Sequence, residues 1–156
     1  MQRQIEAQHI QADRQRRFEH SRDRREPRSQ AYADLVAQTQ HVGTLISVMN
    51  QTEEYTTASV HEASEQITKL LRCRARVVVE GPVVVAKSTE DLVEAIVECR
   101  EVLATLTSLP GAPPELQGLS RTQLTELCRQ GLESIAECLA TFVEEARQAL
   151  DDNGTA

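Results

Sequence analysis

The chain has 156 residues, a formal net charge of −7 and 40% hydrophobic residues, but only two Phe, two Tyr and no Trp. This length fits one domain that can bury an independent core. The scarcity of aromatic side chains argues against the base-stacking platform that readers of single-stranded nucleic acid use. No window approaches 18 uninterrupted apolar residues and no apolar segment follows the N-terminus, so we expect neither a membrane span nor a signal peptide.

The charge is distributed unevenly along the chain. Residues 1–30 contain eight Arg against five acidic residues, whereas residues 31–156 carry a net charge of −10. A basic segment on an acidic body has two explanations. Its charges pair along the surface of a solvated helix, or the segment docks to an acidic protein, nucleic acid or anionic lipid.

Residues 1–27 are expected to form a polar helical arm that is rich in Arg and Gln. The large apolar residues of this arm, Ile5, Ile10 and Phe18, are spaced by five and eight and make no continuous stripe. A helix of this kind is marginal alone, so we expect it to gain from a partner helix, as in a coiled coil. Pro27 is expected to kink or restart the helix, because proline lacks an amide hydrogen.

Apolar residues then repeat at spacings of three and four, the pattern of amphipathic helices that bury one face. The expected helices span residues 28–51, 53–80 and 82–108, with a fourth that begins after residue 120. Their predicted inward residues are Tyr32, Leu35, Thr39, Val42, Ile46 and Met49; Val60, Ala63, Ile67, Leu70 or Leu71, and Val77 or Val78; Val85, Thr89, Leu92, Ile96, Cys99, Leu103 and Leu106; and Cys128, Leu132, Ile135, Leu139, Phe142, Ala146 and Leu150.

The segment around Gly81 and Pro82 has two interpretations, because two runs of three valines flank it. Valine favours strands, but a lone hairpin is unstable without a sheet to join. Gly81 suits the position after a helix and Pro82 suits the first turn of the next one. We therefore favour a helix on each side.

The connections between the helices predict how they pack. The first three helices have short connections, which make antiparallel neighbours. Residues 107–118 form a linker rich in Pro and Gly, after which Ser120 and Gln123 have the spacing of a capping box. The predicted fold is all-α, an antiparallel four-helix bundle over residues 28–151 with a long polar N-terminal helical extension and a disordered tail over residues 152–156.

Residue types that carry chemistry are scattered. Cys73, Cys99, Cys128 and Cys138 form no CxxC pair, and unpaired thiols suit a reducing cytoplasm. Glu6 and His9 have an ExxH spacing, but the core helices hold no matching pair. Arg72, Arg74, Arg76 and Lys69 cluster near the end of the second helix, where they complement its dipole or contact an anion. We predict no catalytic residue, no cofactor and no metal site.

Residues 24–37 (RREPRSQAYADLVA) and 78–86 (VVEGPVVVA) resemble segments of uncharacterised all-helical proteins of actinobacteria. Those proteins combine an Arg/Gln-rich helix with a helix junction at an EGP sequence. Some carry a membrane anchor before the Arg-rich helix, and this chain begins directly in the polar helix. The resemblance implies a helix on each side of Gly81–Pro82 and implies no activity.

We predict a non-enzymatic, cytoplasmic helical interaction protein that acts through protein–protein contacts or self-association, with a homodimer as the expected form. The candidate partner-binding residues are Ile5, Ile10, Arg14, Arg17, Phe18, Arg24 and Arg25. The alternative is electrostatic binding of nucleic acid or an anionic membrane surface through the Arg-rich arm. We favour it less, because five acidic residues interrupt the arginines and no recognisable nucleic-acid-binding motif is present.

Overall fold

The computed structural model describes the backbone of residues 2–109 and 113–152, and the side chains of residues 11–16, 25–109 and 113–152. Within these ranges the chain forms four α-helices: α1 (Gln2–Thr52), α2 (Thr57–Glu80), α3 (Val83–Leu106) and α4 (Arg121–Asp152). The described residues contain no strand, which confirms the helical interpretation on both sides of Gly81 and Pro82.

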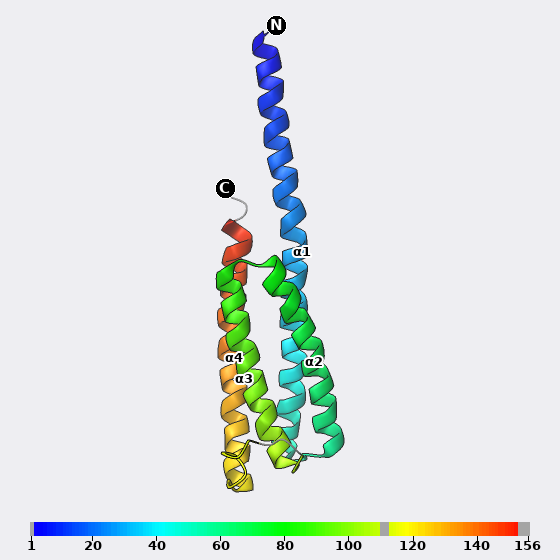
Figure 1. Ribbon diagram of the computed structural model, residues 1–156, viewed down its shortest axis with the longest axis vertical. Coiled ribbons are helices and arrows are strands. Elements are labelled where there is room, and N and C mark those ends of the chain that lie inside the picture. The colour runs from blue at the N-terminus through cyan, green and yellow to red at the C-terminus, as the bar shows by residue number, and fades with distance from the viewer. Residues whose placement is uncertain (1, 110–112, 153–156) are drawn as a thin grey trace.

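The four helices form an antiparallel bundle in which α1 and α3 each pack against α2 and α4 (Figure 1). At 1.5 Å per residue, the 51 residues of α1 span about 76 Å. Figure 1 shows α1 continuing far past the bundle, from the end where α2 meets α3 and where α4 finishes. This arrangement confirms the predicted bundle with its N-terminal helical extension.

The core consists of the apolar stripes that the spacing predicts. In α2 the two open choices are decided, because Leu70 and Val77 are fully buried while their neighbours Leu71 and Val78 are 38% and 42% exposed. The predicted inward residues at the margins are only half-buried and pack against the core; they are Leu106, Leu132, Leu139 and Leu150.

The predicted start of the second helix at residue 53 is wrong. Glu53 has a φ of 52°, a left-handed conformation that no right-handed helix can include. The helix begins instead after Thr56, which caps it: the Thr56 hydroxyl accepts from the Ser59 amide at 3.1 Å, and the Ser59 hydroxyl accepts from the Thr56 amide at 3.0 Å. Capping satisfies amides that have no partner inside the helix, so it decides where α2 starts.

The predicted capping box of the fourth helix is present. The Gln123 amide donates to the Ser120 hydroxyl at 3.3 Å, and the Ser120 amide donates to the Gln123 side chain at 2.9 Å. α4 then continues to Asp152, and residues 153–156, most of the predicted tail, lie outside the described residues.

Pro27 lies inside α1, so the predicted restart of the helix at this residue is wrong. Figure 1 shows α1 as one continuous helix. Pro27 is exposed. The helical turns that follow it are held by packing in the bundle, which compensates for the hydrogen bond that proline cannot make.

Candidate interaction site

The arm was predicted over residues 1–27, and its described part, from Gln2 onward, runs past the ends of the other three helices (Figure 1). Arg14 and Arg25, two of the predicted partner-binding residues, are exposed. Arg25 follows Arg14 by eleven positions, which corresponds to about 17 Å along a helix axis. The structure therefore exposes both arginines but does not bring them together.

The other five predicted partner-binding residues, Ile5, Ile10, Arg17, Phe18 and Arg24, have side chains outside the described residues. Their backbone belongs to α1. Their part in binding a partner stays a prediction.

The root of the arm is attached to the bundle by polar contacts to two helices. Arg25 lies 3.8 Å from the Asp151 carboxylate near the end of α4, with side chains 52% and 70% exposed. The Arg28 guanidinium donates to the backbone carbonyl of Glu80 at the end of α2. Exposed ion pairs contribute at most about 1 kcal/mol each, so the direction of the arm depends mainly on the continuity of α1.

Two arginines of the basic cluster in α2 bridge to neighbouring helices, a role that the sequence did not predict. Arg74 makes hydrogen bonds to both carboxylate oxygens of Glu90 on α3, at 2.7 and 2.6 Å. Arg76 donates to Asp34 on α1 at 2.7 Å. Neither lies in the last turn of α2, where the dipole acts, and both already contact a carboxylate.

The junction of α2 and α3 lies at the same end of the bundle as the arm (Figure 1), and its valines are exposed. Val79 is 81% exposed, Val83 is 85%, Val84 is 59% and Val78 is 42%. We call these four residues the valine corner. Exposed apolar side chains at one end of a bundle are a candidate surface for contact with another molecule.

Sequence reasoning did not single out the valine corner, although the sequence contains a signal for it. Successive residues of a helix point 100° apart, so a run of three valines cannot turn all its side chains to one core. Val77 and Val85 are fully buried, and the other two valines of each run are exposed to solvent. Arg72, Glu80 and Lys87 are exposed close by in sequence, so the surroundings of the corner carry both signs of charge.

Gly81 lets the junction approach the root of the arm closely. It caps α2 in an extended conformation, with its amide donating to the Val77 carbonyl at 2.7 Å. A Cβ at this position would lie 2.8 Å from the Val77 carbonyl oxygen and 3.0 Å from the Tyr32 hydroxyl. The glycine is therefore needed for close packing against Tyr32 rather than for a left-handed turn.

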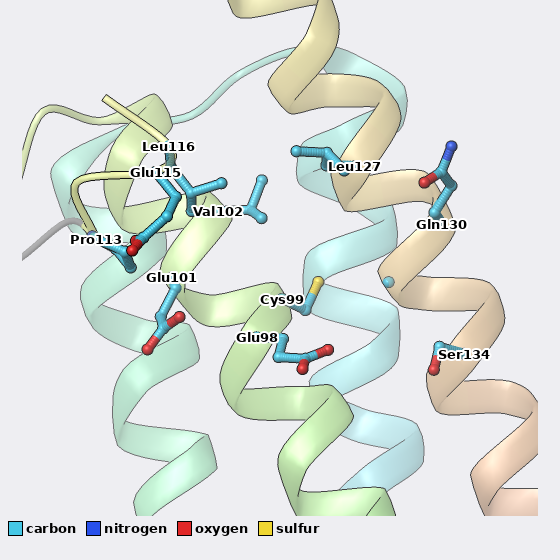
Figure 2. Close-up of a pocket in the computed structure, with 11 residues that line it drawn as sticks. Glu98, Cys99, Glu101, Val102, Pro113, Glu115, Leu116, Leu127, Gln130 and Ser134 are labelled. Atoms are coloured by element: carbon cyan, nitrogen blue, oxygen red, sulfur yellow. The ribbon is translucent and has the colours of Figure 1, made fainter. Parts of the chain in front are cut away.

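A groove of about 420 Å³ lies between α3, α4 and the segment that joins them (Figure 2). Glu98, Glu101 and Glu115 line it together with Cys99, whose sulfur lies 4.0 Å from the Cys128 sulfur. The hydrogen bond to Cys128 and burial both raise the pKa of the Cys99 thiol. A protonated thiol is a poor nucleophile, so Cys99 is not expected to be reactive. The described residues also contain no group of three or more His, Cys, Asp or Glu side chains that could hold a metal ion.

A second groove, of about 670 Å³, lies between α1 and α4. Its lining is uncharged: Thr39, Gln40, Gly43, Thr44, Ser47, Val48, Gln51, Leu132, Ile135, Ala136 and Leu139. Val48 is 52% exposed here, and Val143 on α4, one turn beyond Leu139, is 44% exposed. These two valines resemble the valine corner in exposure but lie along the side of the bundle.

Comparison of the chain with protein-family models, with curated proteins and with solved structures finds no match. Across the described residues, no helix contains a stretch both apolar and long enough to cross a bilayer.

Proposed function

We propose that this chain is a non-enzymatic helical interaction protein, which acts through protein–protein contacts or self-association and uses the arm as its docking segment. The observation that carries the proposal is the length of α1, whose N-terminal part continues beyond the other three helices (Figure 1). A solitary polar helix gains little stability from its own hydrogen bonds. A partner lying along the arm would supply the missing contacts.

The surroundings of the arm support this proposal. The valine corner lies at the end of the bundle from which the arm leaves, so a partner on the arm has apolar surface within reach. In the first groove, the hydrogen bond to Cys128 and burial raise the pKa of the Cys99 thiol, which makes it a weak nucleophile. We expect a cytoplasmic location, since all four cysteines are free thiols.

Deletion of residues 1–27 tests the proposal. Light scattering would measure the oligomeric state, and affinity capture would compare the bound proteins of the full and shortened chains. We expect the deletion to lower the mass of the assembly or to remove captured partners, while far-ultraviolet circular dichroism still shows a cooperative helical fold. A folded shortened chain with the same mass and the same partners would contradict the proposal.

The second candidate function is electrostatic binding of nucleic acid or an anionic membrane surface. Exposed Arg14 and Arg16 on the described part of the arm favour it, although Asp13 beside them is exposed too. Phosphate contacts release counterions, so binding of this kind weakens steeply with salt. A salt titration of the full chain with duplex DNA would separate the two functions, because helix packing through apolar contacts depends on salt much less.

A further inference from the structure

The arm projects beyond the end of the bundle at which the valine corner lies (Figure 1). From Gln2 to Pro27 the arm is about 38 Å long at 1.5 Å per residue. A flat surface that approached the corner along the bundle axis would meet the arm first. A helix that lies alongside the arm reaches the corner without obstruction. The projection of the arm beyond the corner therefore favours a helical partner.

The charges of the arm indicate which helix fits. Residues 2–13 contain one Arg and two acidic residues, a net charge of −1, whereas residues 14–28 contain seven Arg and three acidic residues, a net charge of +4. Two arms side by side in the same direction would place the +4 halves together. Two arms in opposite directions place each +4 half beside a −1 half, which is the favourable arrangement.

Opposite directions also bring the correct ends together. When two arms pair in opposite directions with Ile5 of one level with Arg28 of the other, Ile10 lies only about 8 Å farther along the helix axis, and the N-terminal end of one arm lies beside the root of the other. The root is where Arg28 contacts the carbonyl of Glu80, which lies between the two pairs of valines that form the corner. The bulky apolar residues near that N-terminal end are Ile5 and Ile10. Both copies make the same contacts, so the assembly closes as a two-fold dimer and leaves no open chain of contacts.

We propose that the valine corner is the receiving site for the N-terminal end of the arm of a second copy, in an antiparallel dimer of arms. This inference rests on the proposed function, and it adds the identity of the partner, the direction of pairing and the surface that ends the interface. Val79 and Val83, the most exposed valines, take the Ile5 and Ile10 end of the neighbouring arm.

The test uses the full chain and sedimentation equilibrium. In one variant, Val79→Ser and Val83→Ser are combined. In the control, Val48→Ser and Val143→Ser are combined, because these valines are 52% and 44% exposed but lie on α1 and α4 and do not belong to the valine corner. We expect the corner variant to raise the dimer Kd by about tenfold or more and the control to leave it within about twofold. Equal effects of both variants, or a wild-type chain that stays monomeric, would overturn the inference.

A double-mutant cycle identifies the segment that occupies the corner. The variant Ile5→Ser/Ile10→Ser should weaken the dimer alone, and adding it to the corner variant should cost less than the sum of the two effects, because both remove the same contact. Additive effects would show that the isoleucines and the corner belong to separate contacts. They would overturn the inference, while loss of self-association on deletion of residues 1–27 would leave the proposed function standing.

Cross-linking checks the direction independently of affinity. An Ile5→Cys chain mixed with a Val79→Cys chain should form a disulfide-linked pair under air oxidation, above the background of the wild-type cysteines. An Ile5→Cys chain mixed with a Val48→Cys chain should not. A monomeric chain that binds phosphatidylserine vesicles only when the corner valines are intact would overturn the second copy as the occupant in favour of a membrane surface.

Discussion

The rings of Tyr32 and Phe142 meet edge to face, with centroids 5.9 Å apart and planes at 88°. Tyr32 belongs to α1 and Phe142 to α4, and both are buried. The Tyr32 hydroxyl also lies beside Gly81 at the junction of α2 and α3. This one aromatic pair thus joins α1, α4 and the α2–α3 junction near the root of the arm.

Phe142→Ala should lower the free energy of unfolding by about 3–5 kcal/mol, because it removes a fully buried ring and leaves a cavity. Urea denaturation followed by circular dichroism measures the change. The neighbouring Val143 is 44% exposed, and Val143→Ala should change the free energy by about 0.5 kcal/mol or less. Similar losses at the two positions would show that Phe142 is not a core residue.

Tyr32→Phe should leave the stability unchanged or raise it by about 1 kcal/mol. The Tyr32 hydroxyl is buried and makes no hydrogen bond within the described residues, so its removal takes away a desolvated polar group while the edge-to-face contact with Phe142 remains. Thermal unfolding of the two chains at pH 7 measures the difference. A loss above about 1 kcal/mol would mean that the hydroxyl has a partner, such as an ordered water molecule.

The same substitution should have opposite effects at two glycines. Gly81→Ala places a Cβ 2.8 Å from the Val77 carbonyl oxygen, and relief of that overlap should cost about 1–3 kcal/mol. Gly43→Ala adds a methyl group inside α1 where nothing lies within 4 Å, and the better helix propensity of alanine should add about 1 kcal/mol. Denaturant unfolding gives both values, and a stabilised Gly81→Ala chain would refute the close packing at the junction.

Glu126 should stay ionised to unusually low pH. Hydrogen bonds from Arg129 and then Gln130 lower the pKa of its carboxyl from 4.5 to about 2. The shifted carboxylate therefore contributes stability above pH 4.5, and this contribution is lost as the pH falls toward about 2. Carbon-13 NMR titration of the side-chain carboxyl would show Glu126 still ionised at an acidity where an ordinary glutamate is mostly protonated.

Two arginine variants check the cause of the Glu126 shift. Arg129→Ala removes hydrogen bonds of 2.6 and 2.9 Å to the Glu126 carboxylate and should return its pKa toward the ordinary range. Arg147→Ala is the matched control, because Arg147 donates to Glu144 instead, at 3.2 Å. A Glu126 titration that is the same in both variants would mean that the pair with Arg129 does not persist in solution.

The sequence by itself determined the helices and most of the core. Spacings of three and four select one face of a helix, so Tyr32, Leu35, Ile96 and Leu103 were correctly predicted to be buried. The capping residue of α4 was also predicted, since its interaction with Gln123 is local. Successive residues of a helix point 100° apart, so the spacing alone left two neighbouring residues, such as Leu70 and Leu71, as alternatives for one buried position.

Only the tertiary structure decided the choices that depend on a neighbouring helix. It buried Leu70 and Val77 rather than Leu71 and Val78, and it directed Arg74 to Glu90, a carboxylate 16 residues away on another helix. It also placed the exposed valines beside the root of the arm, which nothing local in either segment encodes. The spacing of apolar residues along the chain specifies which face of a helix is apolar. Contacts between residues of different helices are fixed only when those faces pack together.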